Sequence, residues 1–174
     1  MIFLAGYSRH GKGEVSQILG SYFGWRAYSS SWVARVEVYG SSPLLQREWR
    51  DPDHAWENRH YNRKEWYNRI QAINRPCKTT LAETLFSMPH AYVYDGIRDR
   101  EELRACMHKW PDALSVWVYR PSCKEESSES CTVRAADCDF VIMNSGTLPD
   151  LQRRVKKVFE RIRVKEPRCM SASR

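Results

Sequence analysis

The sequence predicts an α/β fold built on an open parallel sheet, on two observations. Short apolar runs of strand length alternate with segments of helical periodicity along the 174 residues. The first run, Ile2–Ala5, is apolar throughout and breaks directly into a glycine-rich turn, which is typical of a buried strand. A chain of this length suits a single domain with a sizeable core.

The first half of the chain supplies two strands and four helices. We expect strands at 2–5 and 25–28, and helices at about 12–23, 29–38, 64–74 and 80–86. Apolar residues on one face define the first helix, with Gly24 as its stop, and Ser29 caps the second. Residues 39–63 are polar, aromatic and turn-rich, with one glycine and two prolines.

The second half supplies three more strands and two helices. We expect strands at 91–94, 115–119 and 140–142, and helices at 100–109 and from 148 to about 162. Thr147-Leu148-Pro149-Asp150 has the capping-box pattern in front of the last helix. Residues 120–136 form a polar connection between two strands.

The connection after the first strand carries the most specific motif of the chain. Gly6, four residues and then Gly11-Lys12 lie between a strand and a helix, which is the spacing of a phosphate-binding loop. Glycines let the backbone turn so that amides face phosphate oxygens, and the lysine reaches the β- and γ-phosphates. The alternative is a chance glycine turn before a helix. Candidate ATP contacts are Gly6, Ser8, Arg9, His10, Gly11, Lys12, Gly13, Glu14, Asn144 and Gly146.

One position departs from the motif, because Gly13 stands where Ser or Thr usually holds Mg²⁺. The metal is then held by water, by Glu14 or Ser16, or by a carboxylate elsewhere such as Asp95. His10, inside the loop, either contacts phosphate or is exposed, and no catalytic role follows from its position.

Asp95-Gly96-Ile97-Arg98 lies just past the third expected strand. Ligands of open parallel sheets gather beyond the carboxyl ends of the strands, so Asp95 and Arg98 are expected to converge on the phosphate loop. Asp95 is a candidate to accept a proton from an acceptor hydroxyl or to hold Mg²⁺, and Arg98 to brace a phosphate. Alternatively, Asp95 caps the next helix and Arg98 pairs with Glu101 or Glu102.

Aromatic and arginine side chains alternate between residues 47 and 75. Aromatic faces stack on bases and guanidinium groups hold phosphates, so we expect an acceptor-binding lobe at about 39–76. Its candidate contacts are Arg47, Arg50, Trp56, Arg63, Trp66 and Tyr67. The alternative is that Trp66 and Trp49 are core residues with solvated arginines between them.

Two further segments are candidates for the transfer site. Arg134 lies in the polar connection over the expected triphosphate, where it is a candidate to stabilise the charge on the transferring phosphoryl group. A surface arginine is the alternative. Asn144-Ser145-Gly146-Thr147 follows the last strand, where a base can rest, although a plain turn and helix cap explain the same residues.

Charge and cysteine content indicate which classes of binding partner to expect. Residues 1–150 carry 19 basic and 19 acidic residues, whereas residues 151–174 carry 9 basic and 2 acidic, which is the whole net charge of +7. A basic terminal helix with a flexible tail at 164–174 can follow a nucleic-acid backbone, or can be a solvated helix face and loose tail. Six cysteines without metal-ligand spacing are expected to be reduced thiols, and no apolar run is long enough to cross a membrane.

Taken together, these motifs resemble phosphate-loop kinases related to bacteriophage deoxynucleoside monophosphate kinases and dephospho-coenzyme A kinase. The resemblance rests on Gly6–Lys12, on Asp95–Arg98 with Glu101-Glu102-Leu103 after it, on Asp139–Leu148 and on Asn62–Tyr67. It implies a three-layer P-loop kinase fold at 1–163 with helices on both faces of the sheet, and ATP with Mg²⁺ as cofactors. It also implies that Lys12 binds phosphate, that Arg98 binds the acceptor, and that Asn144 belongs to the loop that holds the base.

The acceptor stays open between a hydroxyl and a phosphate. A related phage kinase class phosphorylates the hydroxymethyl group of 5-hydroxymethyluracil in DNA, and a candidate base, the aromatic–arginine segment and the basic terminal helix favour it. The alternative is a free deoxynucleoside monophosphate. A third hypothesis is a nucleotide-binding module without transferase activity, which Gly13 favours. For either kinase we expect a nucleotide substrate and no membrane partner. We expect the protein to act in the cytoplasm, and in the host cytoplasm if a phage encodes it.

Overall fold

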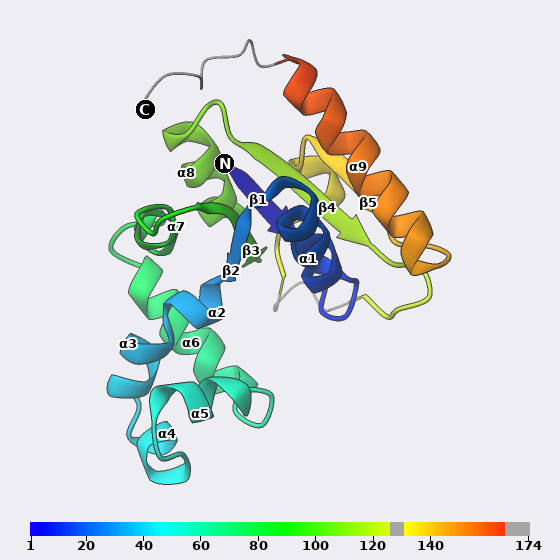
Figure 1. Ribbon diagram of the computed structural model, residues 1–174. Helices are drawn as coiled ribbons and strands as arrows, with labels where there is room; N and C mark the ends of the chain where they lie inside the picture. The colour runs from blue at the N-terminus through cyan, green and yellow to red at the C-terminus, as the bar shows by residue number, and fades with distance from the viewer. Residues whose placement is uncertain (126–130, 166–174) are drawn as a thin grey trace.

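The computed structural model describes residues 1–125 and 131–165. The strands are β1 Ile2–Ala5, β2 Arg26–Ser29, β3 Ala91–Ile97, β4 Leu114–Tyr119 and β5 Phe140–Met143. They form one parallel sheet in the order β2-β3-β1-β4-β5, with β1 at the centre (Figure 1). From residue 166 onward, the expected tail lies outside the described residues.

Nine α-helices surround this sheet within the described residues. They are α1 Lys12–Phe23, α2 Ser30–Val33, α3 Arg35–Gly40, α4 Pro43–Glu48, α5 Pro52–Glu57, α6 Arg63–Asn74, α7 Thr80–Phe86, α8 Arg100–Lys109 and α9 Leu148–Lys165. A short 3-10 turn spans Ala135–Asp137. In the described part of the chain, no helix combines the length and the apolar character that a membrane span requires.

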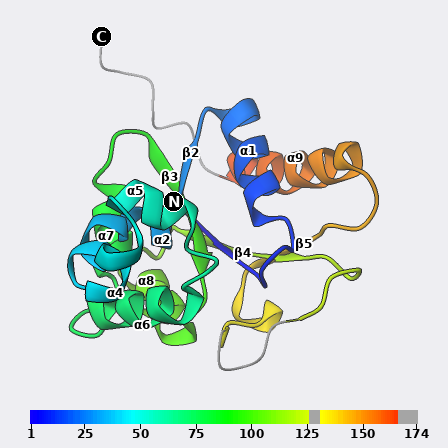
Figure 2. The same ribbon diagram turned by 90° about the horizontal axis from the view of Figure 1, so that it is seen from below.

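Helices cover both faces of the sheet, which confirms the predicted layering. α1 and α9 lie on one face, and α7, α8 and the helices of residues 30–74 lie on the other (Figures 1 and 2). Along β1, Ile2 and Leu4 belong to the core beneath α1 and α9, whereas Phe3 and Ala5 belong to the core on the opposite face. Because both faces are covered, a continuous apolar strand is what this position demands.

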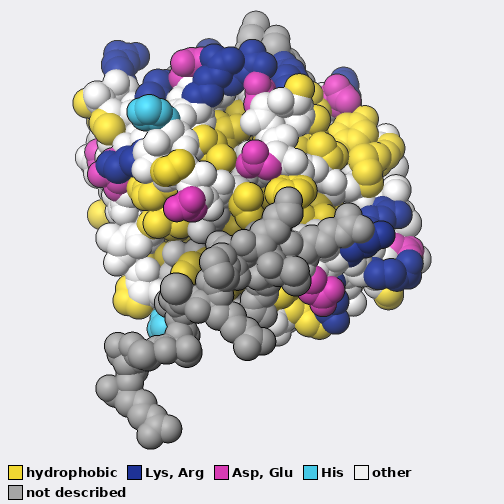
Figure 3. Space-filling model, turned by 90° about the horizontal axis from the view of Figure 1, so that it is seen from above, with side chains coloured by type: hydrophobic (Ala, Val, Ile, Leu, Met, Phe, Trp, Pro, Cys, Tyr) yellow, Lys and Arg dark blue, Asp and Glu magenta, His cyan; other side chains and the backbone are white. Residues whose placement is uncertain are grey.

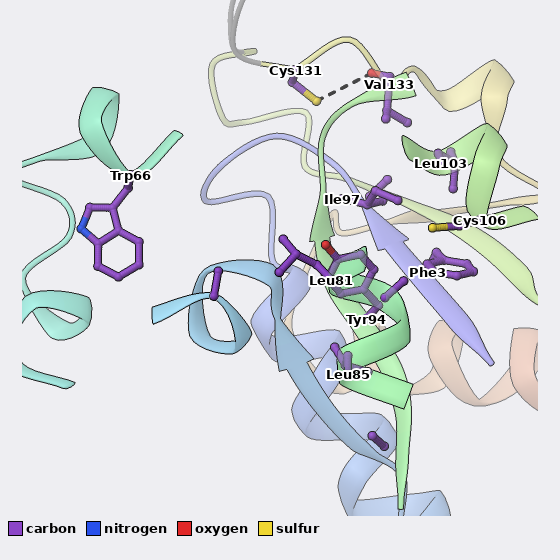
Figure 4. Close-up of a cluster of buried hydrophobic side chains, with 14 of the residues drawn as sticks. Phe3, Trp66, Leu81, Leu85, Tyr94, Ile97, Leu103, Cys106, Cys131 and Val133 are labelled. Atoms are coloured by element: carbon purple, nitrogen blue, oxygen red, sulfur yellow. Dashed lines mark hydrogen bonds between the residues drawn. The ribbon is translucent and has the colours of Figure 1, made fainter. Parts of the chain in front are cut away.

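The core on the α7 and α8 side is the larger of the two and extends into the helical lobe (residues 30–86, α2 to α7). Figure 4 shows Phe3 and Tyr94 of the sheet facing Leu85 of α7 and Leu103 of α8, with Trp66 at the lobe end of the cluster. The Trp66 side chain is only 3% exposed. It is therefore a core residue, and the alternative interpretation of this tryptophan is the correct one.

Segment 39–63 differs from its expected turn-rich character, because it contains two short helices. Ser42 caps α4 by accepting a hydrogen bond from the Leu45 amide (3.4 Å), and Asp51 caps α5 by accepting one from the His54 amide (2.8 Å). A proline follows each cap at the first helical position, where its missing N–H is not needed. The expected helix at 29–38 is divided at Ala34 into α2 and α3.

β3 is longer than predicted and includes Asp95, Gly96 and Ile97 of the motif that was expected to follow it. Leu4 of β1 pairs with Asp95, and the next residue, Ala5, pairs with Ile97. Gly96, with a φ of +95°, is therefore the extra residue of a β-bulge. A bulge bends its strand and redirects side chains, and here it sits beside Asp95 at the carboxyl edge of the sheet.

α9 begins where the capping-box pattern predicts, and the Asp150 half of the box forms. The amide and the hydroxyl of Thr147 both donate to Asp150 Oδ2, at 3.0 and 2.7 Å. These bonds, the backbone one first, lower the pKa of Asp150 to about 2. Gly146 has a φ of +96°, and a Cβ there would meet the Asp150 carboxylate at 2.8 Å, so this glycine serves the helix cap.

The cysteines of the described residues are free thiols: Cys77, Cys106, Cys123, Cys131 and Cys138. The same residues contain no group of three or more His, Cys, Asp or Glu side chains arranged to hold a metal ion.

Candidate nucleotide-binding site

The backbone between β1 and α1 forms a tight loop that depends on its two motif glycines. Gly6 and Gly11 have φ values of +143° and +98°, which side-chain-bearing residues rarely adopt. A Cβ on Gly6 would lie 2.4 Å from the carbonyl oxygen of Val118, and one on Gly11 would lie 2.1 Å from Nδ2 of Asn144. The backbone of Val118 therefore excludes a side chain at Gly6, whereas a side chain at Gly11 would need an uncommon φ and would displace the Asn144 amide.

Lys12 is the first residue of α1, and its ammonium group folds back across the loop. Its Nζ donates to the carbonyl oxygens of Gly6 at 2.9 Å and Tyr7 at 2.8 Å. These contacts keep the positive charge on the loop itself, at the amino end of a helix whose dipole has the same sign.

Two more carbonyl oxygens of the loop are held from distant parts of the chain. Cys123 Sγ donates to the carbonyl of Arg9 at 3.5 Å, and Asn144 Nδ2 donates to the carbonyl of His10 at 3.0 Å. When the carbonyls of a tight turn are held by the surrounding protein, its amides are left to line the concave side. A backbone nest of this kind is how phosphate loops bind anions.

The imidazole of His10 is fully buried, so the expectation that it is exposed to solvent is wrong. The Arg120 amide donates to His10 Nδ1 at 3.0 Å, which assigns the proton to Nε2, 3.3 Å from the Lys124 carbonyl oxygen. The ring also packs edge-on against Tyr7, with 5.2 Å between centroids. His10 therefore fastens the loop to the segment that follows β4.

Asp95 lies at the carboxyl end of β3, half-buried and next to the first turn of α1. Ser16 Oγ donates to its Oδ2 at 3.4 Å. Burial raises the pKa of Asp95, while the Lys12 ammonium, the Ser16 hydroxyl and the Arg98 guanidinium oppose that shift, and the Glu14 carboxylate adds to it. The structure thus brings Lys12 close to Asp95 and Arg98, which lie far from it in the sequence.

The cap of α8 is Asp99 rather than Asp95. Asp99 Oδ1 accepts a hydrogen bond from the Glu101 amide at 2.9 Å, and its other oxygen pairs with Lys78 at 2.5 Å. Glu101 in turn pairs with Arg104 at 3.0 Å. The alternative interpretation of Asp95, as the cap of the next helix, is therefore wrong.

Arg134 lies next to the loop, beside the phenol of Tyr7. Burial raises the pKa of Tyr7, and the Arg134 charge opposes that rise. The Arg134 guanidinium donates to the carbonyls of Cys131 and Val133, the latter at 2.8 Å. The amide of Val133 donates to the carbonyl of Arg98 at 3.2 Å, so this segment is attached to the end of β3.

An open cleft of about 360 Å³ lies beside the phosphate loop. Its lining comes from the loop, from the start of α6 and from the segment after β4: Ser8, Arg9, His60, Arg63, Lys124 and Glu125. Three of these side chains are cationic, and Arg9 is held at a φ of +65°, an uncommon conformation for this residue. The cleft therefore offers positive charge next to the point where the loop would hold phosphate.

Arg59 adds a second guanidinium close to Arg63. Its guanidinium lies 4.4 Å from the centre of the Trp56 ring, and its Nη1 donates to the Trp56 carbonyl at 2.8 Å. Burial lowers the pKa of Arg59, and the nearby charge of Arg63 lowers it further. Two like charges held this close favour an anion as their partner. Sequence reasoning did not select Arg59, although it belongs to the alternating aromatic–arginine pattern.

The other expected acceptor contacts do not line this cleft. Arg47 and Arg50 are exposed on and after α4, where Arg50 pairs with Asp51 at 3.0 Å. Tyr67 is 37% exposed on α6, and Trp66 is in the core. Of the expected acceptor contacts, Arg63 lines the cleft beside the loop. Trp56 does not line it, but its ring contacts Arg59, which lies close to Arg63.

Neither a protein-family model nor a curated protein matches the sequence. Among solved structures, the chain is similar to shikimate kinase from Aquifex aeolicus, with a TM-score of 0.52, 15% identity, and 95% of this chain and 99% of that one covered. It is also similar to TT1252 from Thermus thermophilus, with a TM-score of 0.51, 18% identity, and 92% and 96% covered. The chain has a P-loop kinase fold. At these identities, the likeness extends to the fold alone.

Proposed function

We propose that this chain is a kinase that transfers the γ-phosphoryl group of ATP to a nucleotide-type acceptor. The observation that carries the proposal is the loop of residues 6–13, with its carbonyls held by the surrounding protein and Lys12 folded across it. The similarity to shikimate kinase, which is a fold likeness, supports the same class of chemistry.

In this proposal, the loop amides and Lys12 bind the β- and γ-phosphates, and Arg98 and Arg134 stabilise the charge that develops during transfer. Mg²⁺, when bound with ATP, would neutralise charge on the same phosphates. The oxygens near Lys12 suit that ion, because Ser16, Asp95 and Glu14 offer a hydroxyl and carboxylates, the ligands that magnesium prefers.

For the acceptor, we favour the hydroxymethyl group of 5-hydroxymethyluracil in DNA. A hydroxyl must lose a proton during transfer, and Asp95, whose pKa is raised by burial, is a stronger base than an exposed aspartate. On the face seen in Figure 3, Lys and Arg side chains gather in groups that Asp, Glu and apolar side chains interrupt. A DNA path along such groups would be discontinuous and sensitive to salt.

A free deoxynucleoside monophosphate is the second candidate, and the cationic cleft favours it. A monophosphate arrives ionised and needs positive charge more than a base. Arg9, Arg63 and Lys124 supply that charge directly beside the loop. We place the reaction in the cytoplasm, that of the host if a phage encodes the chain.

The test is transfer of label from γ-labelled ATP. The acceptors are DNA with 5-hydroxymethyluracil, the same DNA with thymine, and each deoxynucleoside monophosphate. We expect label in the first DNA only, and a loss on the order of a thousandfold for Lys12→Ala. Label in a nucleoside diphosphate instead identifies the second candidate. Slow ATP turnover with no labelled acceptor would refute kinase activity and favour a non-catalytic nucleotide-binding module.

A further inference from the structure

The hydroxyl that usually follows the loop lysine is missing at Gly13, and crowding does not explain its absence. A Cβ on Gly13 would meet nothing within 4 Å, so a serine would fit there. Gly13 is also exposed within the first turn of α1 and has no positive φ. The chain therefore has room for the usual metal contact but does not use it.

Ser16 carries the next hydroxyl group along α1 after the position of Gly13. It lies three positions after Gly13 on α1, and residues three apart lie on one helical face about 5–6 Å from each other. Helical side chains lean toward the amino end of their helix, so the Ser16 side chain leans toward the loop. Ser16 is half-buried between the helix and the end of β3.

The hydrogen bond from Ser16 to Asp95 fixes how the hydroxyl is presented. Because Ser16 Oγ donates its proton to Asp95 Oδ2 at 3.4 Å, the lone pairs of the hydroxyl oxygen are directed elsewhere. Lys12 and Arg98 lie close enough to affect the charge of the same carboxylate, so the pair adjoins the residues assigned to phosphate. An outer carboxylate that orients a hydroxyl is a common way to tune a metal contact.

We propose that Ser16, oriented by Asp95, replaces the missing hydroxyl and holds the hydrated Mg²⁺ that accompanies ATP. Magnesium sheds water reluctantly and usually keeps several water ligands, so a hydroxyl one helical turn farther back can bind it through a water. An acceptor hydroxyl would then use the second carboxylate oxygen of Asp95. This inference rests on the proposed function, because the metal comes with the nucleotide.

The experiment measures Mn²⁺ binding to the complex with a nonhydrolysable ATP analogue, by electron paramagnetic resonance. We expect Ser16→Ala to weaken Mn²⁺ binding about tenfold and to leave metal-free analogue binding within about twofold. Adding Gly13→Ser to Ser16→Ala should restore the Mn²⁺ affinity, since it supplies the hydroxyl at the usual position. Ser21→Ala, an exposed serine on the same helix, is the matched control and should change neither affinity.

Unchanged Mn²⁺ affinity in Ser16→Ala, with normal analogue binding, overturns the inference and leaves the proposed function intact. A loss in Glu14→Gln with none in Ser16→Ala also overturns it, because the metal contact then belongs to the exposed carboxylate in the first turn of α1. If the unmodified protein binds no analogue with or without metal, the proposed function itself fails and takes this inference with it.

Discussion

The phosphate loop and the helical lobe are built by opposite strategies. The backbone path of the loop is set by residues that adjoin one another, because Gly6 and Gly11 permit its φ values and Lys12 closes it from within, and distant residues then brace it. The lobe is specified by contacts between distant residues, such as the Trp49 Nε1–H donating to Asn62 Oδ1 at 3.0 Å. A motif therefore identifies the phosphate end of the site, whereas the acceptor end depends on tertiary structure.

The short helices of the lobe depend on contacts with the rest of the structure. α4 and α5 have six residues each, too few to be stable alone in water. They are held by side-chain bonds that cross between elements, including Ser42 Oγ to Glu65 at 2.6 Å and Tyr39 OH to the Trp49 carbonyl at 2.9 Å. Changes in the loop should therefore act on chemistry, and changes in the lobe on acceptor affinity.

Asp95→Asn tests the residues assigned to phosphoryl transfer and, after Lys12→Ala, has the largest expected effect on activity. Asparagine keeps the size and accepts the Ser16 hydrogen bond, but it is not a base, so kcat should fall on the order of a hundredfold with a hydroxyl acceptor. Transfer kinetics at saturating ATP measure this. A change of only a few-fold would make Asp95 a positioning residue and not a general base.

Gly11→Ala and Gly13→Ala form a matched pair within one turn of the chain. At Gly11, the positive φ and the close approach of Asn144 leave no room for a Cβ, so ATP-analogue affinity should fall about tenfold or more. At Gly13, the Cβ meets open space, so affinity should hold and the helix should gain about 1 kcal/mol. Calorimetric titration and thermal unfolding separate the two effects, and equal losses in both variants would contradict the loop geometry.

Arg63→Ala tests the lobe. Arg63 lines the cleft beside Arg9, so the KM for the acceptor should rise about tenfold, with the KM for ATP unchanged. Arg47→Ala is the control, because that arginine is exposed and does not line the cleft. If both variants behave alike, the cleft is not where the acceptor binds.

Glu102→Gln probes the contact between α8 and the sheet and should have the smallest effect on phosphoryl transfer, because it changes stability instead. Burial raises the pKa of Glu102 from 4.5 to about 7, although the Tyr94 hydroxyl donates to it at 2.7 Å. Between those values the folded state holds a proton that the unfolded state has lost, so the free energy of unfolding decreases as pH rises. The glutamine variant should be more stable at pH 8, by about 1–3 kcal/mol, and little changed at pH 4. Parallel pH profiles of thermal unfolding for both proteins would contradict this.

The sequence was informative wherever local geometry decides the structure. Lys12 follows from spacing, Asp95 and Arg98 follow from the rule that parallel strands end at one edge, and the cap at Thr147 follows from its pattern. The bulge at Gly96 did not follow, because it depends on how β1 and β3 pair.

Contacts across long stretches of chain carry no local signal. Asn144 braces the His10 carbonyl across 134 residues, and no pattern in either segment predicts that bond. The buried ring of His10 was missed for the same reason, since its partners lie after β4. Arg59 cannot be distinguished from neighbouring arginines in the sequence, because its contact with the Trp56 ring depends on the fold of the lobe.

A crystal structure with a nonhydrolysable ATP analogue tests the central claim most directly. The account predicts β- and γ-phosphate oxygens at about 3 Å from the amides of Gly11, Lys12 and Gly13, with the Lys12 ammonium moved from the loop carbonyls onto phosphate. An analogue bound elsewhere, with Lys12 still on the carbonyls of Gly6 and Tyr7, would contradict it.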